Sequence, residues 1–151
     1  MKKPRWKEGN IVQIPLGDSL RAYGRMLRRP YYAIYKSVTD VDLGTEEILS
    51  LPILFKLAVT HDSYLSGRWE IVGHKHLEPA LTQPLKFFKQ DMYTGKITIY
   101  LEGGTEIPVG DENYFDLERA SVWGPLHIED RIMDTHLGKE NKWTLQLAIK
   151  K

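Results

Sequence analysis

Apolar and polar side chains alternate with a period of two in the first part of the chain. Val12, Ile14 and Leu16 follow this alternation, and it resumes at Leu20 and Ala22. Between the two runs lies the turn-forming tripeptide 17–19, Gly-Asp-Ser. Because side chains two residues apart share one face of a strand, the pattern predicts a β-hairpin near residues 10–29.

Further runs of the same type occur along the rest of the chain and predict about eight strands in all. After the hairpin, the predicted strands lie at residues 31–35, 53–60, 68–73, 85–90, 96–101 and 144–150. Strands with one apolar and one polar face are typical of antiparallel sheets.

The clearest helix is predicted over residues 125–137. Gly124-Pro125 suits its start, because proline is preset for the first helical position, and Gly138 suits its end. Ile128, Ile132 and Leu137 are expected to form its buried stripe. Shorter helical segments are predicted near residues 45–50 and 62–65.

These elements predict a strand-rich α+β protein, with a curled antiparallel sheet or open barrel and a C-terminal helix packed on it. The length of 151 residues fits a single domain over 1–151, and residues 1–8 are expected to be a loosely ordered lead-in. No run approaches the roughly 18 apolar residues of a membrane helix, and no signal-peptide core follows the basic start, so a cytoplasmic location is expected.

The composition excludes several kinds of chemistry. The chain contains no cysteine, which excludes disulfides, thiolate metal sites and a cysteine nucleophile. No phosphate-binding glycine loop or nucleophile elbow is present, so no catalytic residues and no cofactor are expected. Net charge is +1, but residues 1–36 carry nine Lys or Arg against two acids, whereas the remainder carries twelve against eighteen.

The basic first part of the chain suggests an alternative function, the binding of nucleic acid. Arg21, Tyr23 and Arg25 share one predicted strand face, and such a mixture of cations and rings suits phosphates and stacked bases of single strands. Small β-barrels often bind nucleic acid in this way. The near-neutral net charge argues against this reading, and a solvated outer face is the plainer interpretation.

Two clusters of titratable residues offer weaker alternatives. His74 and His76 would point the same way from a strand, with Glu78 nearby, which is the beginning of a metal site for a metal-dependent hydrolase. Two histidines at a strand end are more often a surface feature, and no metal is predicted. His127, Asp130, Arg131 and Asp134 share one helix face, where the arginine favours a structural ion-pair network over cation binding.

An acidic stretch offers a protein-binding surface. From Glu102 to Glu118 there are six acids and no Lys or Arg. Acidic residues around exposed aromatic rings suit a basic protein partner. The charges increase the rate of association, and the rings supply apolar area that is buried in the complex. The alternative is a solvated loop whose rings turn into the core. The residues predicted to contact a partner are Glu102, Glu106, Asp111, Glu112, Tyr114, Phe115 and Asp116.

Four segments, at residues 9–16, 22–27, 67–73 and 117–132, resemble the bacterial immunity protein 26 family. The resemblance extends from about residue 6 to residue 147. Residues 117–132, Leu-Glu-Arg-Ala-Ser-Val-Trp-Gly-Pro-Leu-His-Ile-Glu-Asp-Arg-Ile, are its most distinctive block. Asn10 and Ser121 depart from the expected acidic residue and alanine.

The resemblance implies an immunity protein of a polymorphic toxin system, which neutralises a cognate toxin by direct binding and is not an enzyme. It also implies that the recurrent residues of the block define either the fold or the toxin contact, and the residue types favour a role in the fold for Trp123 and Arg131. These recurrent residues are Glu118, Arg119, Trp123, His127, Asp130 and Arg131.

Overall fold

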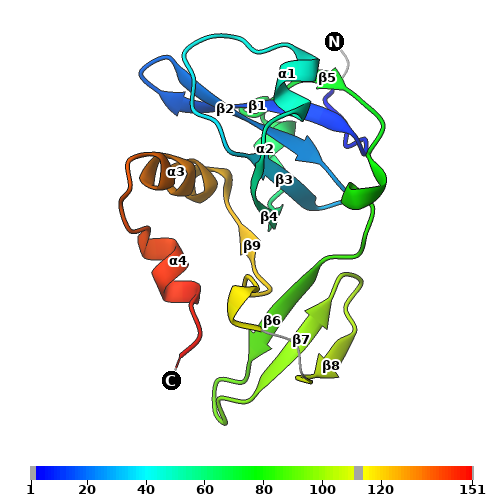
Figure 1. The fold of residues 1–151 in the computed structure, drawn as a ribbon, viewed down its shortest axis with the longest axis vertical. Coiled ribbons are helices and arrows are strands. Elements are labelled where there is room, and N and C mark those ends of the chain that lie inside the picture. The colour runs from blue at the N-terminus through cyan, green and yellow to red at the C-terminus, as the bar shows by residue number, and fades with distance from the viewer. Residues whose placement is uncertain (1–2, 111–113, 151) are drawn as a thin grey trace. The chain divides into compact units, whose positions relative to one another are not determined.

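The computed structural model describes residues 3–110 and 114–150, and these form two compact units. Unit 1 comprises Met1–Thr82 and Val122–Asn141, and unit 2 comprises Gln83–Ser121 and Lys142–Lys151, each as far as it is described. The predicted strand-rich α+β class is confirmed, because nine strands in two open sheets accompany helices in the described residues (Figure 1).

Unit 1 contains a six-stranded sheet in the order β5-β1-β2-β3-β4-β9. Its strands are β1 (Asn10–Gly17), β2 (Leu20–Met26), β3 (Tyr31–Tyr35), β4 (Ile53–Val59), β5 (Glu70–His74) and β9 (Val122–Trp123). Neighbours are antiparallel except β4 and β9. The predicted hairpin is confirmed as β1 and β2, and Asp18 and Ser19 at its turn have positive φ angles of 50° and 65°, which match the twist of a tight hairpin.

Helices cover both faces of this sheet (Figure 1). They are α1 (Thr45–Leu49), α2 (Asp62–Leu65) and α3 (Pro125–His136), with a 3-10 turn η1 (Pro79–Leu81) after β5. On one face, Ile48 of α1 packs in a buried cluster with Ile11, Tyr23 and Tyr35. On the other face, the guanidinium of Arg131 in α3 lies 4.1 Å from the ring centre of Phe55.

The start of α3 agrees with the prediction. Gly124 is its N-cap, Pro125 opens the first turn, and Gly138 with φ of 70° follows the C-cap. Ile128 and Ile132 are buried as expected, but Leu137 is 55% exposed and does not belong to the buried stripe. The helix has already ended at Leu137, which leaves that side chain beyond the face packed on the sheet.

An ion pair between exposed Arg68 and buried Glu129 joins the segment before β5 to α3. The carboxylate of Glu129 accepts hydrogen bonds from Arg68 at 2.8 and 2.6 Å and from the indole nitrogen of Trp69 at 3.0 Å. Trp69 is fully buried and Glu129 is 7% exposed. The hydrogen bond to Glu129 raises the pKa of Arg68 above its ordinary value. These hydrogen bonds therefore hold α3 on the sheet, because they satisfy both the buried carboxylate of Glu129 and the buried indole of Trp69.

Trp6 lies in the stretch that was expected to lead loosely into the fold. Its indole nitrogen donates to the carbonyl of Leu27 at 3.0 Å. Its ring meets those of Tyr32 and Tyr64 edge-on, with centroid distances of 5.0 and 5.6 Å. These contacts connect the described N-terminal residues to the sheet face that carries α3.

Unit 2 contains a three-stranded antiparallel sheet in the order β6-β7-β8. Its elements are β6 (Lys86–Gln90), β7 (Ile97–Leu101), β8 (Glu106–Pro108), a 3-10 turn η2 (Tyr114–Asp116) and the helix α4 (Lys142–Leu147). Phe87, Phe88 and Ile99 are the buried apolar residues among those described for this unit.

The strand predicted over residues 144–150 is wrong, because the chain forms α4 there. Leu145 and Leu147 alternate with polar residues, but so short a run does not distinguish a strand from a helix. The guanidinium of Arg119 donates to the carbonyls of Leu147 at 2.8 Å and Ala148 at 3.2 Å. These bonds satisfy carbonyls at the helix end that have no partner within the helix.

In the described part of the chain, no helix combines the length and the apolar character needed to cross a bilayer.

Candidate protein-binding surface

Arg119 packs against Phe88 of the unit 2 sheet. Its guanidinium lies 4.9 Å from the ring centre of Phe88 and donates to the side-chain oxygen of Gln90 at 3.3 Å. The backbone of Phe88 also bonds to Glu118 and Ala120 at 3.0 and 2.8 Å. Together with its bonds to the end of α4, these contacts connect partly buried Arg119 to the framework of unit 2, so its geometry supports a role in the fold.

Two of the predicted contact acids are engaged within the sheet of unit 2. Glu102 accepts from the backbone nitrogen of Leu85 at 2.9 Å, at the open end of the β6–β7 hairpin. Glu106 accepts from the hydroxyl of Thr98 at 2.9 Å and lies 3.9 Å from the ammonium of Lys89. Since these carboxylates already have partners, a binding partner would have to compete for them.

The aromatic pair of the acidic stretch is arranged differently. Tyr114 and Phe115 stack with centroids 4.5 Å apart and an interplanar angle of 29°. Phe115 is nevertheless 70% exposed, and Asp116 beside it is exposed. The ring of Phe115 therefore does not turn into the core. Asp111 and Glu112 lie outside the described residues.

The block at 117–132 is divided between the two units. Glu118 and Arg119 belong to unit 2, whereas Trp123 and the α3 residues belong to unit 1. Arg131 stacks over Phe55 and also lies 5.2 Å from the ring centre of Trp123, which is 4% exposed. This packing supports the expected role of both residues in the fold.

The helix face predicted to hold an ion-pair network contains His127 and Asp130, which are both exposed on α3. Asp134 on the same helix accepts from the side-chain nitrogen of Asn141 at 3.0 Å. Arg131 is directed to the rings beneath it, as described above. The cluster thus includes structural contacts that hold the end of α3 and the residues after it.

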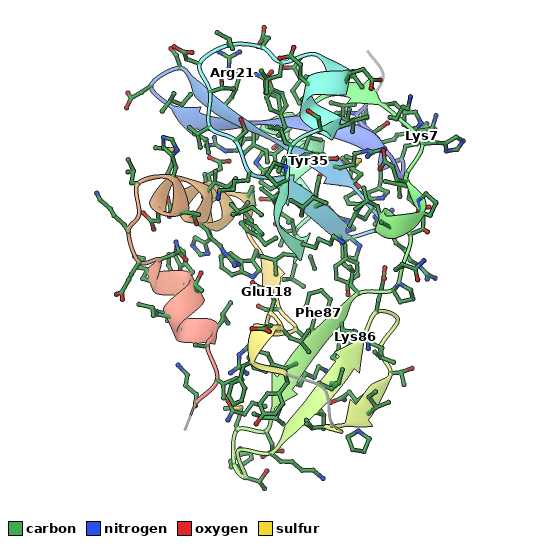
Figure 2. The ribbon with its side chains drawn as sticks, in the orientation of Figure 1. Lys7, Arg21, Tyr35, Lys86, Phe87 and Glu118 are labelled. Atoms are coloured by element: carbon green, nitrogen blue, oxygen red, sulfur yellow. The ribbon has the colours of Figure 1, made fainter. Side chains whose placement is uncertain are left out.

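The strand face predicted for nucleic acid is not available. Tyr23 is 1% exposed and Arg25 is 0% exposed, while Arg21 forms an ion pair with Asp42. This side of the sheet is covered by α1 and the segment that precedes it, as Tyr35 in the interior and Arg21 at the edge illustrate in Figure 2. The prediction of an exposed basic and aromatic face is therefore wrong, because alternation identifies a shared face but not whether it is covered.

Arg25 instead holds the chain after β5. Its guanidinium donates to Glu78 at 2.7 Å and to the carbonyls of Lys75 and His76 at 2.6 and 2.8 Å. Desolvation opposes ionisation of Glu78, but the hydrogen bond and charge of Arg25 outweigh it and keep the pKa of this carboxyl below its ordinary value. Desolvation by burial raises the pKa of the neighbouring Tyr35.

The paired histidines do not form a metal cluster. His74 and His76 have ring centroids 6.2 Å apart, and the Nδ1 atom of His74 lies 2.9 Å from the side-chain oxygen of Asn10. Glu78, the suggested third ligand, is bound by Arg25. Over residues 3–110 and 114–150, no three histidines or acids are grouped so that they could hold a metal ion. Desolvation, followed by the charge of Lys7, lowers the pKa of His74.

One surface feature of unit 2 was not predicted from the sequence. Met92 and Tyr93, between β6 and β7, are 91% and 94% exposed. A signal for them exists, since two large apolar residues stand inside a turn sequence, Asp-Met-Tyr-Thr-Gly, that separates two strands.

The chain matches a model of a known protein family. The model of the family described as immunity protein 26 matches residues 7–97, which is more than half of the chain. The match includes residues 9–16, 22–27 and 67–73 but ends before residues 117–132, so the roles expected for that block stay predictions. No curated protein and no solved structure matches the chain.

Proposed function

The chain belongs to the immunity protein 26 family, and from this membership we propose that it neutralises a cognate bacterial toxin by binding it directly. In this proposal it acts in the cytoplasm of the cell that makes it, without catalysis and without a cofactor. The observation that carries the proposal is the family match over residues 7–97. The partner is therefore a protein rather than nucleic acid or a membrane.

The toxin contact is proposed to include the η2 turn of unit 2. Phe115 is 70% exposed although it stacks on Tyr114, so its ring is already ordered before a partner arrives. An ordered aromatic side chain loses little conformational entropy on binding and is a common anchor. Asp116 beside it would attract a basic toxin surface. Glu106 stays a predicted contact, for which a partner would compete with Thr98 and Lys89. Asp111 and Glu112 stay predicted members of this surface.

The proposal is tested by expressing the protein together with the toxin encoded beside its gene. Cells producing the toxin alone should stop growing, and co-expression should restore growth. The two purified proteins should also form a complex in size-exclusion chromatography. Absence of both rescue and complex would contradict the proposed function.

The contact surface is tested by Phe115→Ala. This variant should raise the Kd about tenfold, which corresponds to about 1.4 kcal/mol. Leu126→Ala is the matched control, because Leu126 is also an exposed apolar residue, 58% accessible, but lies on α3 of unit 1. Asp116→Lys should slow association, and more so at low salt. Unchanged binding by both unit 2 variants would place the contact elsewhere.

A further inference from the structure

The hairpin of β6 and β7 ends in a tip, residues 91–96, that presents apolar side chains to solvent. Met92 is 91% exposed and Tyr93 is 94% exposed, which are the highest values among the exposed large apolar residues described. Single exposed apolar residues are ordinary, but two adjacent ones at this level leave nearly their whole side-chain area without a protein contact. Such area contributes to binding only if a partner covers it.

The backbone of the tip is held by hydrogen bonds. The carboxylate of Asp91 accepts from the backbone nitrogens of Tyr93 and Thr94, both at 2.8 Å. These bonds lower the pKa of Asp91. Asp91 also bonds through its backbone to Lys96 at 2.8 Å and to Gly95 at 3.0 Å. Gly95 has a φ of 73°, which a residue with a side chain adopts at a cost. The tip is therefore ordered in advance of binding.

The base of the hairpin is fastened to the C-terminal segment. The side-chain nitrogen of Gln90 donates to the carbonyl of Lys150 at 2.6 Å, and the backbone nitrogen of Lys150 donates to the side-chain oxygen of Gln90 at 2.8 Å. Gln90 also donates to the carbonyl of Gly95 at 3.3 Å. A single side chain thus joins β6, the tip and the segment after α4, and the tip projects from a supported base.

Charges near the tip are mainly positive. Lys96 closes the turn and Lys150 lies at its base, and both are exposed. The ammonium of Lys89 on β6 lies 4.6 Å from the ring centre of Tyr100 and 3.9 Å from a carboxylate oxygen of Glu106. The carboxylate of Asp91 is occupied by the backbone of its own turn. An apolar tip with a basic surround fits a partner pocket that has an apolar floor and an acidic rim.

We propose that Met92 and Tyr93 form an anchor that inserts into an apolar, acid-rimmed pocket of the cognate toxin. This inference rests on the proposed function and adds to it a second contact, separate in sequence from η2. Methionine adapts to irregular apolar pockets, and tyrosine is enriched among the residues that dominate binding energy. Because the tip is ordered beforehand, little of that energy is spent on fixing the backbone.

The experiment measures toxin binding by the full chain in calorimetry. The double variant Met92→Ala with Tyr93→Ala should raise the Kd at least about 30-fold, which corresponds to about 2 kcal/mol. Tyr93→Phe should retain most of the affinity, since the ring is kept. Val41→Ala with Leu65→Ala is the matched control, because these residues of unit 1 are 56% and 53% exposed. The control should bind as the unsubstituted protein does.

Folding of each variant is checked by thermal unfolding, where exposed side chains should change little. If the unsubstituted protein binds the toxin and the tip variant binds equally well, the anchor is overturned while the proposed function stands. If the unsubstituted protein does not bind at all, the proposed function fails and the anchor with it.

Two further experiments test whether the hairpin tip binds a membrane or a second copy of the chain instead of the toxin. Tip-dependent sedimentation with vesicles of phosphatidylglycerol and phosphatidylethanolamine would identify a membrane anchor and overturn the proposal. A dimer of the unsubstituted protein in light scattering, with a monomer for the tip variant, would identify a second copy of the chain as the occupant and would also overturn it. Monomers that do not bind vesicles, together with the loss of toxin affinity, support the toxin anchor.

Discussion

Unit 1 and unit 2 differ in where they place their aromatic side chains: those described for unit 1 are buried or partly buried, whereas two in unit 2 are exposed. Unit 1 buries both faces of its sheet, and even Arg25, at 0% exposure, lies inside with a set of acceptors around it. Unit 2 buries Phe87, Phe88 and Ile99, yet leaves Tyr93 94% exposed. Its ordered turns hold exposed rings where they contact solvent.

From this difference we expect unit 1 to contribute mainly to stability and the turns of unit 2 mainly to binding. A sheet covered on both faces derives its stability from buried apolar area and satisfied polar groups. A small sheet with few buried residues has less of both, but it offers protruding turns on an ordered base. We therefore expect substitutions in unit 1 to lower the free energy of unfolding, and substitutions at the turns of unit 2 to affect binding instead.

The largest effect is expected for Arg25→Ala. Its removal leaves the carbonyls of Lys75 and His76 and the carboxylate of Glu78 without their donor, which should lower the free energy of unfolding by about 3 kcal/mol. Denaturant titration measures the change, and Arg28→Ala, at an exposed position of the same unit, should stay within about 0.5 kcal/mol. A loss below about 1 kcal/mol for Arg25→Ala would remove the contrast between the units.

A smaller effect is expected for Glu129→Ala. The indole nitrogen of buried Trp69 would lose its acceptor, and Arg68 would lose both of its bonds, at a cost of about 2 kcal/mol. Glu129→Gln retains one acceptor and should lose about half as much. Glu140→Ala, at an exposed position after α3, is the control. Equal stability of all three variants would contradict the role of Glu129 in holding α3.

Arg119→Ala tests whether unit 2 responds by itself. The variant frees the carbonyls at the end of α4 and should cost about 1 kcal/mol, since the arginine is only partly buried. Hydrogen exchange should speed up in β6 and around α4 while the strands of unit 1 keep their protection. Gln146→Ala, an exposed position on α4, serves as the control. Equal loss of protection in β1–β4 would show that the two units unfold together.

The smallest effect is expected from acid. The folded-state pKa of Glu78 lies below its ordinary value of 4.5, so in that range the unfolded chain binds more protons. The stability contributed by the Arg25–Glu78 pair is therefore fully present above pH 4.5 and is lost as the pH falls through the folded-state pKa. Glu78→Gln should flatten this acid dependence in urea unfolding. An unchanged slope would show that other carboxyls carry it.

Much of the fold follows from local sequence patterns. The hairpin of β1 and β2, the strands β3, β4, β6 and β7, and the start of α3 are confirmed where they were predicted. Long alternating runs and a Gly-Pro helix start depend on local backbone geometry, so they can be recognised without the tertiary structure. The exposure of Phe115 was one of two readings that the sequence left open, and the structure supports the reading that it is accessible.

The sequence by itself determined which side chains share a strand face, because the two-residue period is a property of the extended backbone. Only the tertiary structure decided which faces are covered. Arg21, Tyr23 and Arg25 belong to one face as expected, but α1 and the chain after β5 enclose the latter two. The same reason explains α4 and the hairpin tip: whether a short apolar run packs, folds as a helix or stays in solvent depends on contacts with residues distant in sequence.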